Sequence, residues 1–256
     1  MAINKTKRQR RNDLRALAVR LATVVFLGMM IVAALYLYDR LTTSPRLDIA
    51  AVEFDGLARV DEVDLRPLLA DLCGQNLLLA PLRSYEDRLQ MHPRVARARL
   101  RRLPPNRVRC TITEREPVAL LYTDRFLEVD AEGVVMAEDR YTPLLDLPIV
   151  AGVPARAVHP GRACGDPGLR LALEVLRICK ESGGGFVGKV SELRVSAGGV
   201  TIRSLENNCV LVLGDADHER RLQKYFLLES CIAERDERAR LIDLRFEDQV
   251  VLREKS

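Results

Sequence analysis

The sequence predicts an α+β protein in which an N-terminal transmembrane helix precedes two domains outside the membrane. Three observations indicate this class: a charge-free apolar stretch at 21–38, two neighbouring stretches of alternating apolar and charged residues at 95–103 and 107–114, and a later region where short apolar runs alternate with helical patterns. We expect the first domain to follow the order β-α-α-β-β and the second to hold a mainly antiparallel sheet.

The apolar stretch has the length of a membrane span. Its eighteen residues at ~1.5 Å each give ~27 Å, close to the ~30 Å hydrocarbon core of a bilayer. Seven basic side chains and one acidic side chain precede it in residues 1–20, which predicts a cytoplasmic N-terminus and an outer location for everything after Tyr38. A cleaved signal peptide is the alternative, but its apolar core would be shorter and would end at small residues.

The basic character of the chain comes from this tail. The whole chain has a net charge of +4, and the tail alone contributes more than that, so the remaining residues carry −2. A body with a slight negative charge gives no reason to expect a nucleic-acid partner.

The first domain is expected at 49–115, after a linker at 39–48. Turn residues and apolar periodicity define its elements, and Asp61 is a candidate N-cap for the first helix. In order, we expect a strand at 49–54, helices at 61–72 and 81–91, and strands at 95–103 and 107–114.

The last two of these strands have one apolar face and one basic face, because successive side chains of a strand point to opposite sides. The apolar face is expected to pack on the two helices. The basic face is explained as a sheet face exposed to water. The alternative is that it forms a docking patch for an acidic partner, anionic lipid or cell-wall groups. Its members are Arg97, Arg99, Arg101, Arg107 and Arg109.

The second domain is expected at 116–256. A hairpin at 126–136 turns at Glu132-Gly133, and a helix begins at Pro167 with Asp166 as its N-cap. The remaining expected elements are strands at 190–195, 200–205 and 209–213, a helix at 217–234, and strands at 240–246 and 250–252.

No pattern in the sequence predicts catalysis, a metal or a cofactor. Residues 183–188 fit G-x-G-x-x-G, but the loop leaves a helix and enters a strand, the reverse of a dinucleotide site. The three histidines are scattered, and no G-x-S-x-G motif is present. We therefore expect no enzyme activity and no small-molecule substrate; a membrane-anchored cell-wall enzyme would need a catalytic cluster that the sequence does not offer.

The six cysteines are expected to be mostly free thiols. No C-x-x-C pair occurs, and Cys110 and Cys209 fall on apolar strand faces. Cys164 and Cys179 flank one expected helix at ~20 Å, while a disulfide needs Cα atoms within ~7 Å. Cys73 and Cys231 remain open.

Seven short stretches resemble, in order and spacing, the motifs of one protein family. They are residues 74–78 (GQNLL), 91–95 (MHPRV), 101–106 (RRLPPN), 114–119 (EREPVA), 129–136 (VDAEGVVM), 147–152 (LPIVAG) and 242–246 (IDLRF). The β-α-α-β-β order after a membrane anchor resembles a POTRA domain, the first three stretches are similar to motifs of this domain in the FtsQ/DivIB family, and the fourth is similar to the family's E-R-x-P-V-A junction. The chain thus resembles this family over its whole length, anchor included.

The resemblance implies a non-enzymatic scaffold of the cell-division machinery. Members of the family sit in the inner membrane at the septum, bind the bitopic proteins FtsB and FtsL, and help to control septal peptidoglycan synthesis. POTRA domains also occur in secretion and envelope-assembly proteins, which is the alternative, although the junction and the IDLRF ending count against it.

The resemblance also implies a partner site on the C-terminal edge of the second domain, where an FtsB-like protein adds a strand. Phe246 stands where the family has its aromatic anchor, with Asp248 and Val250 just beyond. Phenylalanine replaces the usual tyrosine, which puts any hydrogen bond of the hydroxyl in doubt. From the residues alone, Phe246 is equally well a core residue alternating with Ile242 and Leu244.

Overall fold

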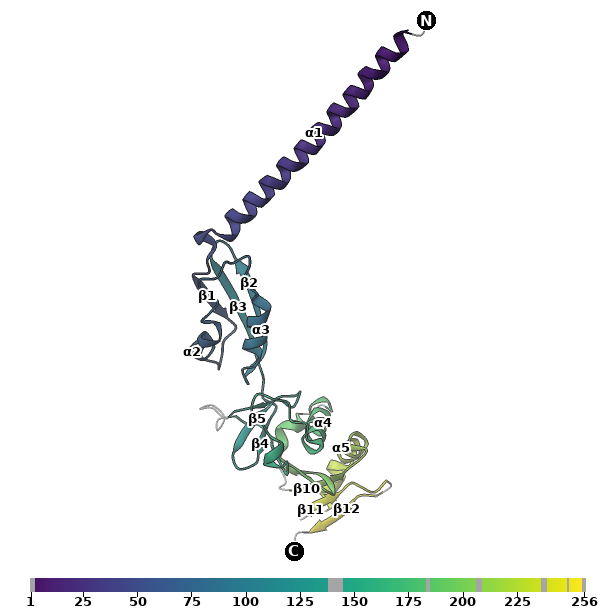
Figure 1. The fold of residues 1–256 in the computed structure, drawn as a ribbon. Helices are drawn as coiled ribbons and strands as arrows, with labels where there is room; N and C mark the ends of the chain where they lie inside the picture. Colours follow the sequence, from purple (N-terminus) through teal and green to yellow (C-terminus); the bar gives the residue numbers. More distant parts are fainter. Residues whose placement is uncertain are drawn as a thin grey trace. The chain divides into compact units, whose positions relative to one another are not determined.

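The computed structural model describes residues 3–137, 145–182, 185–205, 209–235, 239–247 and 249–254, with the side chains of 3–11, 13–16, 230–235, 239–240 and 254 left aside. It confirms the α+β class, with a long N-terminal helix followed by two sheets and their helices (Figure 1). The chain divides into two compact units. The first comprises Met1–Leu57, Asp61–Asp87 and Ala98–Ile112; the second comprises Ala58–Val60, Arg88–Arg97 and Thr113–Ser256.

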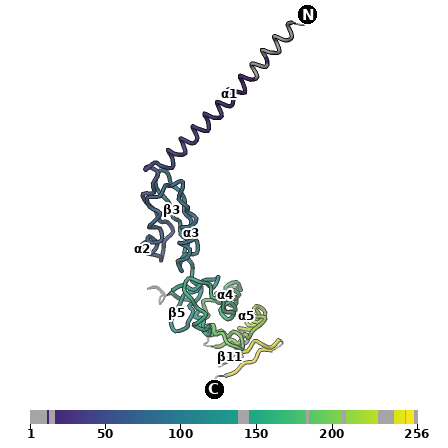
Figure 2. The backbone as a smooth tube through the Cα atoms, in the orientation of Figure 1, coloured from purple at the N-terminus to yellow at the C-terminus, as the bar shows by residue number. Residues whose placement is uncertain are grey.

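Helix α1 spans Ile3–Thr42, and Figure 2 traces its coloured part as one unbroken helix. Its part from Leu17 to Thr42 is long and apolar enough to cross a membrane. The helix includes residues 39–42, which were predicted to belong to the linker. The hydroxyls of Thr42 and Thr43 support this last turn by donating to the carbonyl oxygen of Asp39 at 3.2 and 2.6 Å.

The first sheet and its helices follow one another in the order β-α-α-β-β, which confirms the prediction. Its elements are β1 (Ala51–Asp55), α2 (Glu62–Leu65) with the 3-10 turn η2 (Arg66–Leu69), α3 (Leu82–Gln90), β2 (Val95–Leu103) and β3 (Arg107–Glu114). The strands lie in the order β1-β3-β2, with β1 parallel to β3. Buried side chains of the strands, such as Leu100, Val108 and Ile112, form its apolar face.

The helix expected at 61–72 is shorter than predicted. The α-helical part ends at Leu65 and continues as η2. Pro67 explains the change, because it has no N–H to donate to the carbonyl four residues earlier. Asp61 does precede the helix with an extended backbone, but its side chain makes no capping hydrogen bond.

The second unit contains a nine-stranded sheet in the order β12-β11-β10-β9-β8-β7-β4-β5-β6. Most neighbours are antiparallel; β4–β7, β7–β8 and β10–β11 are parallel. The strands are β4 (Ala119–Tyr122), β5 (Phe126–Val129), β6 (Val135–Met136), β7 (Ile149–Ala151), β8 (Val190–Ser196), β9 (Gly199–Ser204), β10 (Val210–Gly214), β11 (Ala239–Asp243) and β12 (Val251–Glu254). Helices α4 (Pro167–Glu181) and α5 (His218–Arg235) share one apolar core with these strands.

Helix α4 begins as predicted. The Asp166 carboxylate accepts from the backbone N–H groups of Gly168 at 2.8 Å and Leu169 at 3.3 Å, and Pro167 occupies the first helical position. The glycine-containing loop after α4 runs through the 3-10 turn η5 (Phe186–Lys189) into β8. The loop therefore leaves a helix and enters a strand, as predicted from the sequence. A dinucleotide site needs the reverse order, a strand followed by a helix.

Gly152, which ends the LPIVAG stretch, allows β7 and β8 to approach closely. Its φ is +97°, and a Cβ placed there would lie 2.0 Å from the carbonyl oxygen of Val195. Gly152→Ala is expected to destabilise the second unit by about 3 kcal/mol, because a left-handed residue with a Cβ costs 1–2 kcal/mol and the strand must also shift.

The control for this prediction is Gly165→Ala, since no atom lies within 4 Å of a Cβ at Gly165. Urea unfolding of the outer segment, residues 49–256, measures both. The Gly152 variant should unfold at a clearly lower urea concentration than the Gly165 variant, and equal midpoints would contradict the close approach.

Candidate functional site

Strand β12 forms one end of the nine-stranded sheet. It pairs antiparallel with β11, with Asp243 opposite Val251 and Ile242 opposite Leu252, and no described strand lies on its other side. An edge strand presents unpaired backbone N–H and C=O groups, which an incoming strand satisfies. This edge is therefore able to accept a strand from another protein.

The segment after β11 turns Phe246 outward. Ile242 and Leu244 are buried in the core, and Leu244 N donates to the carbonyl oxygen of Val212 at 3.0 Å. Phe246 follows in a bend with 42 % of its surface exposed. The interpretation of Phe246 as an alternating core residue is thus wrong, and so is a strand continuing to residue 246, because β11 ends at Asp243.

A local ion pair shapes this turn. The side chain of Asp243 is buried, and its carboxylate accepts from Arg245 Nε at 2.9 Å, Nη2 at 2.7 Å and backbone N at 3.2 Å. These hydrogen bonds and the Arg245 charge hold the pKa of Asp243 below its ordinary value. The Arg245 guanidinium therefore lies back toward Asp243, the last residue of β11, just before Phe246.

Helix α5 supports the same turn from another part of the chain. Lys224 Nζ donates to the carbonyl oxygen of Phe246 and, at 3.1 Å, to that of Glu247. Sequence reasoning missed both supports. The opposite charges of Asp243 and Arg245 at alternate positions were a usable signal, whereas nothing in the sequence links Lys224 to a residue 22 positions away.

Of the other two residues expected at this site, the structure describes Val250. Val250 is partly buried against the core of the second unit, together with Leu252. Asp248 lies outside the described residues. Phe246 thus lies in the bend between β11 and β12 with its ring exposed.

The ion pair predicts a pH dependence at this edge. A carboxyl group whose pKa is lowered by folding stabilises the fold above its unfolded pKa of ~4, and this contribution is lost as the pH falls through the lowered pKa. Backbone amides of β11 and β12 should therefore lose protection below pH ~4, measured as the exchange rate relative to that of an unfolded chain at the same pH. Hydrogen exchange detected by NMR tests this: Asp243→Asn should already exchange faster at neutral pH and respond less to acid, and an acid response as large as that of the wild type would contradict the assignment.

The five arginines predicted as a basic face are all exposed: Arg97, Arg99, Arg101, Arg107 and Arg109. On the first sheet, Arg107 pairs with Glu53 at 2.6 Å, and Arg109 lies 3.8 Å from the same carboxylate. Arg99 and Arg101 make no ion pair with a described residue. The face is therefore strongly basic, and Glu53 offsets part of its charge.

A buried ionic cluster in the second unit was not predicted. Glu128 on β5 is fully buried and accepts from Arg59 at 2.7 and 3.1 Å and from Arg94 at 2.8 Å. Arg94 also donates to the carbonyl oxygen of Ala137 at 2.8 Å. A buried carboxylate held by two guanidinium groups is a structural arrangement, because both of its oxygens are occupied.

The EREPVA junction joins this cluster. Glu114 accepts from the backbone N–H groups of residues 58, 59 and 60 at 2.7 to 3.0 Å. Burial opposes its ionisation, but these donors and the Arg59 charge together hold the pKa of Glu114 below its ordinary value. Arg115 pairs with the buried Asp130 at 2.7 Å. Glu114 and Arg115 of the junction therefore bind neighbouring segments of the second unit.

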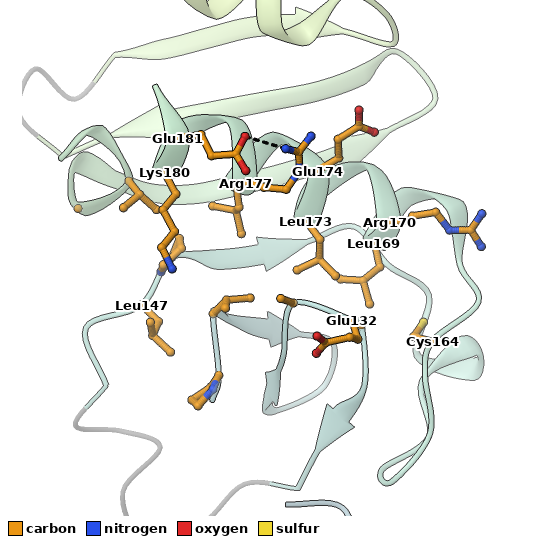
Figure 3. A pocket seen from close by; sticks show the side chains of 18 of the residues that line it. Glu132, Leu147, Cys164, Leu169, Arg170, Leu173, Glu174, Arg177, Lys180 and Glu181 are labelled. Atoms are coloured by element: carbon orange, nitrogen blue, oxygen red, sulfur yellow. Dashed lines mark hydrogen bonds and ion pairs between the residues drawn. The ribbon is translucent and has the colours of Figure 1, made fainter. Parts of the chain in front are cut away.

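A cavity of about 830 Å³ lies beside α4 (Figure 3). Leu169 and Leu173 point from the helix toward the side that carries Glu132, whereas Arg170 points away. On the rim, Arg177 and Glu181 form an exposed ion pair at 2.7 Å. The lining of the cavity is mainly apolar, with scattered charges of both signs. This arrangement favours no particular reaction.

The described cysteines form no disulfide. Cys73, Cys110, Cys164, Cys179 and Cys209 are free thiols. Burial raises the pKa of Cys110, with a further contribution from Glu86, and the pKa of Cys179, each to about 12, so neither is a thiolate at neutral pH. Among the described residues, no three His, Cys, Asp or Glu side chains gather as a metal site.

Comparison with known proteins finds two family models that match consecutive ranges of this chain. A family model described as "POTRA domain, FtsQ-type" matches residues 47–115, and one described as "Cell division protein FtsQ/DivIB, C-terminal" matches residues 119–245. The cell division protein FtsQ of Myxococcus fulvus is 31 % identical over 88 % of this chain and 84 % of its own length. The cell division protein FtsQ of Rhodothermus marinus is 30 % identical over 80 % of this chain and 77 % of its own length. That of Geotalea daltonii is 26 % identical over 80 % of this chain and 78 % of its own length.

Proposed function

Because the chain belongs to the FtsQ/DivIB family of cell division proteins, we propose that it is a non-enzymatic scaffold that recruits and holds division proteins at the septum. In this role it helps to control septal peptidoglycan synthesis through its partners and not through chemistry of its own. The FtsQ-type match of the POTRA range favours division over secretion or envelope assembly.

The proposed location is the inner membrane, crossed once by α1. The length and apolar composition of residues 17–42 support a membrane span. The basic residues of the tail support a cytoplasmic N-terminus and, with it, a periplasmic location of both outer domains.

The proposed partners are FtsB-like and FtsL-like bitopic proteins. The observation that supports this most is the edge of β12 that no described strand covers, together with the exposed ring of Phe246 in the bend that precedes β12 in the sequence. A strand of the FtsB-like protein would pair with β12, which provides affinity through backbone hydrogen bonds. Phe246 would select the partner by filling an apolar pocket on it, since the ring does not need the hydroxyl of the family's tyrosine for such contacts.

The arginine face is proposed as a second docking surface for acidic groups. Arg99 and Arg101 support it, because they are exposed and make no ion pair with a described residue. Reversing both charges, by Arg99→Glu and Arg101→Glu, should leave binding at the β12 edge unchanged.

The test is a titration of residues 49–256 with the outer segment of the FtsB-like protein from the same genome, with and without the FtsL-like protein. Saturable binding supports the scaffold proposal. Binding that the two charge reversals abolish would move the site to the arginine face. No binding by either partner would contradict the proposed partners and favour an envelope-assembly role.

A further inference from the structure

The turn at 74–78 is tied to the end of α1. Asn76 Nδ2 donates to the carbonyl oxygens of Leu41 at 2.9 Å and Thr42 at 3.1 Å. The last carbonyl groups of a helix lack partners within the helix, so Asn76 caps α1 from a distant part of the sequence. All of these residues belong to the first compact unit.

The turn that carries Asn76 is closely held. The side-chain Oδ1 of Asn76 accepts from Leu78 N at 2.9 Å. The backbone carbonyl oxygen of Asn76 accepts from Leu79 N at 3.1 Å and from Ala80 N at 2.9 Å. Arg102 Nε donates to the carbonyl oxygen of Leu77 at 2.5 Å. These bonds involve groups from the turn itself and from β2, so its conformation is defined on several sides.

This defined turn exposes two adjacent apolar side chains. Leu77 is fully buried, whereas Leu78 and Leu79 are 45 % and 56 % exposed. The exposure follows from the hydrogen-bonded shape of the turn and not from a loose loop. Single exposed apolar residues are common on protein surfaces and need no explanation. Two adjacent exposed leucines next to the end of an apolar helix do need one, because the lipid that would surround that helix is an apolar partner for them.

The depth of this turn follows from the helix. If residues 21–38 fill the hydrocarbon core, Thr42 lies ~6 Å beyond Tyr38 along the axis, and the headgroup layer on each side is ~5–7 Å thick. Arg40 and Tyr36 support this placement, because the guanidinium Nε donates to the Tyr36 hydroxyl at 3.3 Å, as expected of an interfacial pair. The Asn76 turn, bonded to Thr42, therefore lies at the level of the lipid headgroups.

We propose that Leu78 and Leu79 insert into the headgroup–acyl boundary of the leaflet in which α1 ends, so that the POTRA domain rests directly on the bilayer. This inference rests on the proposed membrane span of α1. The occupant is the lipid itself, reached through apolar contact: the nearby charges Arg40 and Arg46 are balanced by Asp39 and Asp48, so anionic lipid is not required.

The absence of tryptophan from the chain makes this testable with a single fluorophore. Leu79→Trp in the full chain, reconstituted into phosphatidylcholine vesicles, should show blue-shifted emission. Lipids brominated near the acyl-chain start should quench it at least two-fold, and Leu78→Trp should behave alike. Adding anionic lipid should change the quenching little.

Two matched variants calibrate the result. Val63 lies on α2 in the same unit, and its side chain is 75 % exposed. It follows β1, whose five residues lead ~16 Å away from the turn. The fluorescence of Val63→Trp should therefore not be quenched. Phe26→Trp lies within α1 and should be quenched strongly.

Each failure has a distinct meaning. Quenching of Phe26→Trp without quenching at positions 78 and 79 overturns the inference and leaves the anchor intact. Loss of quenching at Phe26→Trp as well overturns the membrane span itself. Equal quenching of Val63→Trp would show that the domain lies on lipid without using this turn, which also overturns the inference.

Discussion

Replacing Glu128 by alanine is expected to destabilise the second unit by about 3–5 kcal/mol, the range for removing one partner of a buried ion pair. The carboxylate is fully buried, and the side chains that it holds, Arg59 and Arg94, are 22 % and 10 % exposed. Removing it leaves two guanidinium groups without their anion. Arg59 has some access to water, so the loss should fall at the lower end of this range.

Urea unfolding of residues 49–256, followed by circular dichroism, measures this loss. Arg177→Ala is the control, because it removes an ion pair whose side chains are 60 % and 61 % exposed. Such a pair contributes about 0.5 kcal/mol or less. Similar midpoints for the Glu128 and Arg177 variants would mean that the buried cluster does not hold the second unit together.

Phe246→Asp is expected to weaken binding of the FtsB-like partner by about 100-fold, near 2.7 kcal/mol, as for an aromatic residue at the centre of an interface. The substitution should leave the fold intact, because Phe246 lies in a bend outside the strands with 42 % of its surface exposed. The lost affinity would come from the apolar contact and from placing a carboxylate in the partner's pocket.

The matched control is Phe126→Asp on β5. Phe126 is 40 % exposed, close to the value for Phe246, and β5 lies near the opposite end of the sheet order. Isothermal titration with the partner should show normal affinity for the Phe126 variant. Equal weakening of both variants would indicate an indirect effect, and full affinity in the folded Phe246 variant would remove the ring from the interface.

The parts of the fold that depend on local pattern were predictable. The alternation of apolar residues and arginines defined β2 and β3 to the residue, and Asp166-Pro167 defined the start of α4. Gly133, with φ of +79°, forms the hairpin turn expected at Glu132-Gly133. In each case, a few adjacent residues decide the conformation.

The errors at the candidate site arose where side-chain contacts, and not the local apolar pattern, decide the outcome. The sequence pattern of 240–246 is that of a strand, but Arg245 folds back on Asp243 and Lys224 binds the carbonyl groups that follow. The Glu128 cluster joins residues 34 and 69 positions apart, which no local pattern reveals. The position of Phe246 in the site came from the family resemblance; its exposure came from the structure.

The central claim, that the β12 edge accepts a partner strand, is tested most directly by hydrogen exchange with and without the FtsB-like outer segment. We predict slower exchange of alternate backbone amides in Val251–Glu254 when the partner is bound, since those amides gain hydrogen-bond acceptors. Unchanged exchange in β12, with protection appearing instead along β2 and its arginines, would contradict strand addition and place the partner on the basic face.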